Sequence, residues 1–155
     1  MPFCLFCKYF LQLDTVFRMV LLLSCKRVTD LQRKTMNIEE LFDYCMTIPG
    51  AEATTPFNDV TIVMKVMGKM FAMIPTDSDR VCITLKCNPE KAVKLREEYG
   101  CVEGAFHMNK TYWNTIWLDG NMPEKEIKKW INHSVEEVVM KLSKKLQQQY
   151  YGAVR

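Results

Sequence analysis

The residues best suited to chemistry lie in one short segment, where His107 is followed by Lys110, Tyr112 and Trp113. An imidazole can exchange a proton near neutral pH, an ammonium group can bind a phosphate, and an aromatic ring can stack on a nucleobase. A simpler interpretation is a histidine at the end of a strand whose ring is satisfied by backbone hydrogen bonds. The sequence leaves both interpretations open.

Two other patterns could suggest metal or redox chemistry. Cys4-x-x-Cys7 has suitable spacing, but no second cysteine pair or nearby histidine completes a set of four ligands. Methionines recur at every third position from Met64 to Met73, yet alternation along a strand would send neighbouring members to opposite faces. We therefore predict no metal and no cofactor, and assign these methionines to the core.

Catalytic signatures are missing from the sequence. Gly68-Lys69 lacks the earlier glycine and the following serine or threonine of a phosphate-binding loop. The acidic residues fall mostly at helix starts and turns, where the helix dipole accounts for them. His133, one helical turn from Lys129, is expected to be solvated or partly packed. We predict that the protein is not an enzyme.

Charge is distributed unevenly along the 155 residues, whose net charge is +3. Residues 1–35 carry six basic and two acidic side chains, and the remainder is close to neutral. A near-neutral domain lacks the broad positive field that drives non-specific DNA binding. Any nucleic-acid site must therefore be a local patch.

The first 35 residues are predicted to lie outside the folded domain. Their apolar stretches, 3–10 and 16–25, are interrupted by charges and are too short for a bilayer, which needs about 20 apolar residues. The change in charge and periodicity favours a biological start at Met36, with a flexible or membrane-surface extension as the rival interpretation. No membrane association is predicted for the domain.

Cysteine usage indicates a cytoplasmic protein. The chain has seven cysteines, an odd number, and Cys45, Cys82 and Cys87 fall within helix or strand patterns and not in loops spaced for disulfides. Reduced thiols are the expectation.

Periodicity and turn residues predict one α+β domain over residues 36–150. A helix follows the Asn37 cap, another begins at Asn88-Pro89, and the longest begins at Pro123 and continues through Leu146. Strands are expected at 60–67, 70–74, 81–86, 105–108 and 114–118. The predicted order is α-β(3)-α-β(2)-α, a two-layer arrangement of helices on a five-stranded antiparallel sheet.

With these elements in place, a set of short motifs resembles the MmcQ/YjbR family of small bacterial proteins. The matching residues are Ile48-Pro49-Gly50-Ala51-Glu52, Pro56-Phe57, Lys65 with Gly68-Lys69-Met70-Phe71-Ala72, Leu85-Lys86-Cys87-Asn88-Pro89-Glu90, Phe106-His107-Met108-Asn109-Lys110, Trp113-Asn114-Thr115 and His133-Ser134. They span most of residues 36–146. Val135 and Asn58 depart from the family pattern.

The resemblance implies a secretion-chaperone-like fold and a DNA-binding label that many members carry. Lysines stand at its motif positions, and together with a histidine and an indole they form the predicted patch, whose members are Lys65, Lys69, Lys86, His107, Lys110 and Trp113. Nucleic acid, DNA in particular, is the leading expected partner. A protein- or peptide-binding module and a small-ligand or enzyme pocket around His107, Lys110 and Trp113 are the alternatives.

Overall fold

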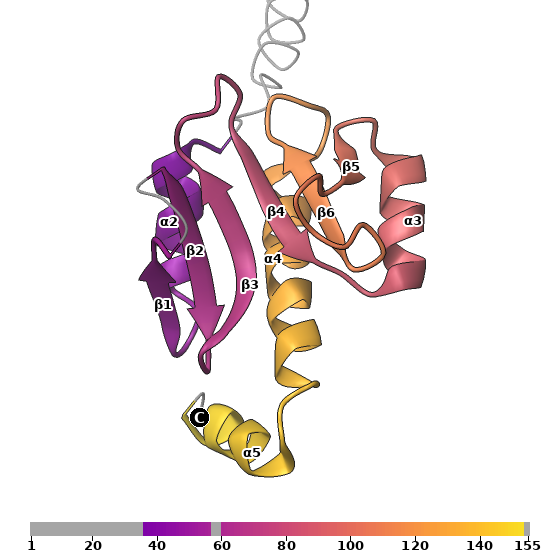
Figure 1. The fold of residues 1–155 in the computed structure, drawn as a ribbon. Coiled ribbons are helices and arrows are strands. Elements are labelled where there is room, and N and C mark those ends of the chain that lie inside the picture. The colour runs from indigo at the N-terminus through magenta and orange to yellow at the C-terminus, as the bar shows by residue number, and fades with distance from the viewer. Residues whose placement is uncertain (1–35, 57–59, 154–155) are drawn as a thin grey trace, which may run out of the picture. The chain divides into compact units, whose positions relative to one another are not determined.

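The computed structural model describes residues 36–56 and 60–153, which form an α+β fold (Figure 1). The helices are α2 (Ile38–Met46), α3 (Pro89–Glu98), α4 (Glu124–Val139) and α5 (Lys144–Ala153). The strands are β1 (Ala51–Thr54), β2 (Thr61–Val66), β3 (Lys69–Pro75), β4 (Cys82–Lys86), β5 (Val102–Gly104) and β6 (Trp113–Trp117). All pairings are antiparallel, in the order β1-β2-β3-β4-β6-β5.

Two helix starts follow the local sequence closely. Asn37 accepts a hydrogen bond from the Glu40 amide at 2.8 Å, and the Glu40 carboxylate accepts one from the Asn37 amide at 3.1 Å. This reciprocal pair satisfies two amides that a helix start otherwise leaves without partners. Asn88 caps α3 by accepting from the Glu90 amide at 3.1 Å, with Pro89 in the first turn.

The core lies between the sheet and the helices on one of its faces. Phe71, Ile83 and Ile116 come from three strands and are fully buried, as is Ile131 of α4. In Figure 1, α4 crosses the sheet where β3 and β4 diverge. The other face of β4 and β6 carries Thr84 and Thr115, which share a groove with the loop 105–112 that joins β5 to β6.

The predicted α+β class and antiparallel sheet are confirmed, but the predicted strand number is wrong. The sheet has six strands because Ala51–Thr54 forms an additional strand, β1, that pairs with β2. In this pairing Thr54 lies opposite Val63 and Ala51 lies opposite Val66. This segment forms an edge strand with two of its four residues exposed. The strand is held by backbone hydrogen bonds and has no alternating hydrophobic pattern, so its polar composition suggested a loop.

Two further boundaries correct the sequence-based prediction. The strand predicted at 105–108 is instead a turn, and the strand lies earlier, at Val102–Gly104. The long final helix is two helices, because α4 ends at Val139 and Ser143 caps α5, its side chain accepting from the Leu146 amide at 3.5 Å. The observed order is therefore α-β(4)-α-β(2)-α-α.

The four cysteines of the described residues are free and buried. Burial raises the pKa of the Cys45 thiol to about 12 and those of Cys82 and Cys87 to about 11, so these thiols stay protonated at neutral pH. Among residues 36–56 and 60–153, no helix has the length and apolarity that a membrane crossing requires. The predictions for residues 1–35 and the departure at Asn58 lie outside the described residues.

Candidate nucleic-acid interface

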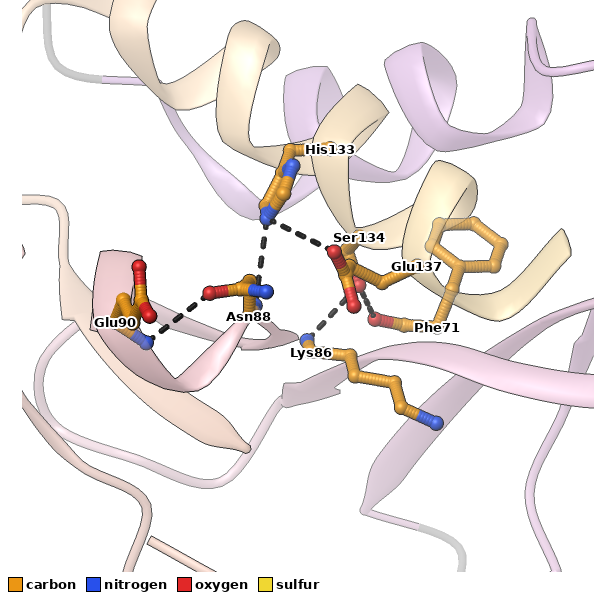
Figure 2. A network of polar contacts seen from close by, with 7 residues as sticks. All are labelled: Phe71, Lys86, Asn88, Glu90, His133, Ser134 and Glu137. Carbon is orange, nitrogen blue, oxygen red and sulfur yellow. Dashed lines mark hydrogen bonds and ion pairs between the residues drawn. The ribbon is translucent and has the colours of Figure 1, made fainter. Parts of the chain in front are cut away.

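A serine of α4 bridges β3 and β4 at the point where these two strands separate. These strands pair only through Ala72 with Leu85 and Met73 with Thr84. Beyond that point the Ser134 hydroxyl accepts from the Lys86 amide at 2.9 Å and donates to the Phe71 carbonyl at 2.5 Å (Figure 2). One hydroxyl thus replaces a ladder hydrogen bond and fixes the end of β4.

His133 lies beside this bridge and connects α4 to the start of α3. Its Nε2 accepts from the Asn88 amide at 3.4 Å and lies 3.8 Å from a Glu137 carboxylate oxygen (Figure 2). Burial, and then the charge of Lys91, lower the pKa of His133, so the ring is neutral. The expectation of a solvated or partly packed ring is corrected, because the residue is buried and bonded to backbone.

The loop 105–112 is held to the rest of the fold by Arg96 of α3. The Arg96 guanidinium donates through Nε to Asn114 Oδ1 at 2.7 Å and through Nη2 to the Lys110 carbonyl. The Ala105 amide donates to the Trp113 carbonyl at 3.1 Å, which closes the base of the loop. The loop is thus anchored from both a helix and a strand.

This anchored loop presents an aromatic ring to solvent. Phe106 is 83% exposed, an unusual position for a phenyl group. His107 meets the Phe106 ring edge-on, with centroids 4.9 Å apart. The Lys110 ammonium lies 5.9 Å from the centroid of the Phe106 ring. A cation and an exposed ring are therefore adjacent on one loop.

A second cation and ring combination lies at the end of the same loop. Lys141, just beyond α4, places its ammonium 4.9 Å from the centroid of Tyr112, which is 37% exposed. Lys86 lies opposite Trp113 in the sheet, with its ammonium 5.8 Å from that ring centroid. Burial, and then the positive charge of Lys141, lower the pKa of Lys86.

The predicted site residues fall into two groups in the structure. Lys86 contacts Trp113, and His107 and Lys110 share the loop 105–112. Lys65 and Lys69 belong to the β2–β3 hairpin, and β4 separates that hairpin from β6 in the sheet. Trp113 is only 7% exposed, so the accessible rings are those of Phe106 and Tyr112.

The sequence did not point to Arg96 as the anchor of the loop or to Lys141 as part of this surface. Both are ordinary charged residues in or beside helices, and only tertiary structure brings them to the loop. Phe106 and Tyr112 lie in the segment that the sequence analysis singled out. More attention to aromatic residues in predicted turns would have identified them as candidates for an exposed surface. We name the set Phe106, His107, Lys110, Tyr112 and Lys141 the loop surface.

The fold and this surface define a small α+β protein with an antiparallel sheet and an anchored loop. A family model described as YjbR matches residues 46–136, and the chain belongs to the YjbR family. The uncharacterized protein YjbR of Escherichia coli strain K12 is 36% identical over 104 residues, which cover 67% of this chain and 88% of that protein.

Other proteins are similar to this chain at lower sequence identity. The uncharacterized protein YbdF of Escherichia coli O157:H7 is 28% identical over 64% of this chain and 82% of its own length. The crystal structure of a Deinococcus radiodurans protein matches with a TM-score of 0.70 and 28% identity, covering 77% of this chain and 91% of that one. A Pseudomonas syringae crystal structure matches with a TM-score of 0.57 and 26% identity, covering 64% and 96%.

Proposed function

We propose that this protein binds single-stranded nucleic acid, DNA in the first instance, through the loop surface, without catalysing a reaction. The observation that carries the proposal is the repeated combination of an ammonium group with an exposed ring, Lys110 with Phe106 and Lys141 with Tyr112. Single strands present phosphates and unstacked bases in alternation, and proteins bind them with lysines beside aromatic side chains.

The energetics of the loop favour such a role. The Phe106 ring is mostly exposed, so its burial contributes little to folding. Stacking of a base on an aromatic side chain contributes about 1–3 kcal/mol per base. Arg96 fixes the loop before any ligand arrives, so less conformational entropy is lost on binding. The Phe106 ring can therefore contribute more free energy to ligand binding than it contributes to folding.

Lys86, Lys65 and Lys69 complete the proposed interface. Lys86 lies next to the loop surface through Trp113 and Lys141. Lys65 and Lys69 lie on the β2–β3 hairpin, and we assign them to an outlying part of the proposed interface. This local distribution suits a domain whose charge is close to neutral.

The proposal is tested by fluorescence anisotropy with the full chain and a labelled oligo(dT) of about 12 nucleotides, a length within the usual range of site sizes. Three to four phosphate contacts predict that log affinity falls with log salt concentration with a slope of about −2 to −3. A duplex of equal length should bind more weakly, because its bases are stacked and paired.

A matched pair of variants makes the test specific. Replacing both loop-surface lysines (K110Q and K141Q) should reduce affinity about tenfold and flatten the salt slope by about 1.4, since each single-strand contact contributes about 0.7. The control pair K125Q and K145Q removes the same charge from exposed positions in α4 and α5. Absence of binding at low salt, or equal losses in both pairs, would overturn the proposal. The double variant K65Q and K69Q measures how much the two hairpin lysines contribute to affinity.

A further inference from the structure

A groove of about 270 Å³ lies between the loop 105–112 and the sheet face opposite the helices. This volume is below the roughly 300–1,000 Å³ of pockets that hold drug-sized ligands, so it suits a smaller molecule. Phe106 and His107 of the loop surface line one side of it, and Thr84 and Thr115 line the sheet side. The groove therefore adjoins the proposed interface.

The sheet side of the groove carries an uncharged pair of hydroxyl groups. Thr84 and Thr115 are opposite each other in β4 and β6, and their Oγ1 atoms are 2.9 Å apart. This bond uses one hydroxyl hydrogen, so the pair retains a second donor and several acceptor lone pairs. Both residues are buried by the protein, which makes these remaining sites valuable to a ligand that can pair with them.

The other lining groups argue against an anion or a metal ion in the groove. Glu103 accepts a hydrogen bond from Trp117 Nε1 at 2.9 Å, and its carboxylate disfavours an anion. Burial raises the pKa of the Cys82 thiol to about 11, so that side chain is neutral. Within residues 36–56 and 60–153, no three His, Cys, Asp or Glu side chains are grouped as a metal site requires. Met73 and Met108 add polarisable apolar surface.

We propose that this groove takes one unpaired nucleobase of the bound strand. A nucleobase is flat and neutral and carries donors and acceptors on its edge, which matches the hydroxyl pair between apolar walls. Lys110, beside Phe106 at the rim, then faces the phosphate of the same nucleotide. The inference rests on the proposed function and adds a place where bases are held by their edges as well as by stacking.

The test compares oligo(dT) with an abasic strand of equal length and charge, using the full chain. The wild-type protein should prefer the base-bearing strand by more than about tenfold, because the abasic strand loses stacking on the loop surface as well as the base in the groove. The near-isosteric variant T84V with T115V removes both hydroxyls and should lower this preference about fivefold, since two neutral hydrogen bonds are lost. The salt slope should not change, because no charge is altered. T55V, at an exposed loop position, is the control.

The outcomes separate this inference from the proposed function. Salt-dependent binding with the full preference retained in T84V with T115V overturns the groove and leaves the loop surface intact. Absence of binding to either strand overturns both. If the double variant does not fold, the methyl signals of Thr84 and Thr115 in the wild-type NMR spectrum decide. They should shift with oligo(dT) and not with the abasic strand, and equal or absent shifts would overturn the groove.

Discussion

Two motifs of this chain pair histidine with polar or charged neighbours, yet the structure uses them in opposite ways. His133 and Ser134 are buried, and each bonds to backbone groups of another element. His107 and Lys110 are exposed and contact the ring of Phe106. The first region stabilises the fold at the separation of β3 and β4, and the second faces solvent. Similar residue types therefore have different roles because of their burial.

The largest expected effect is on stability, from Ser134→Ala. The change leaves the Lys86 amide and the Phe71 carbonyl without their shared partner, and unsatisfied buried groups cost about 1–3 kcal/mol each. We expect the free energy of unfolding to fall by about 2–4 kcal/mol in urea titrations. Thr55→Ala, an exposed hydroxyl, should change it by less than about 0.5 kcal/mol. Equal effects would contradict the bridging role.

A smaller effect, on binding, is expected from Gly104→Ala. A Cβ at this position would lie 3.1 Å from Lys110 Cβ and 3.2 Å from Lys110 Cγ, so the Lys110 side chain would have to move. Oligo(dT) affinity should drop by about threefold, since one of the two lysine contacts of the loop surface is displaced. Gly100→Ala is the control, because its Cβ would meet no atom within 4 Å. Unchanged affinity in Gly104→Ala would argue against Lys110 as a phosphate contact.

The smallest expected effect is the pH dependence of stability due to His133. Its lowered pKa means that the unfolded chain binds this proton more readily than the native protein. The contribution of neutral His133 to stability is fully present above the unfolded imidazole pKa of about 6.5. This contribution decreases as the pH falls below that value. His133→Gln should flatten the decline between about pH 7 and pH 5.

A decline in stability between about pH 7 and pH 5 that is the same in His133→Gln as in the wild-type protein would contradict this role of His133.

The sequence was most informative where local physics determines structure. The caps at Asn37 and Asn88 predicted two helix starts, and the alternation of residues 81–86 predicted β4. The sequence did not predict β1, because that strand is held by backbone hydrogen bonds to β2. It also did not predict the end of α4, because the hydrophobic periodicity continues past Ser143, which caps α5. These features depend on tertiary contacts or on a single cap within an otherwise helical pattern.

The candidate site shows the same division. The cluster of His107, Lys110 and Tyr112 was visible as a local segment, and the structure places all three on one loop. The approach of Lys141 to Tyr112, the Arg96 anchor and the Thr84–Thr115 pair join residues far apart in the chain. No spacing rule within one sequence could predict those contacts.

The most direct test of this account is an NMR chemical-shift titration of the full chain with oligo(dT), read residue by residue. The account predicts that the largest amide shifts fall on residues 105–112 and around Lys141, with small shifts at His133 and Ser134. Shifts concentrated at His133 and Ser134, or no shifts in the loop at low salt, would contradict it.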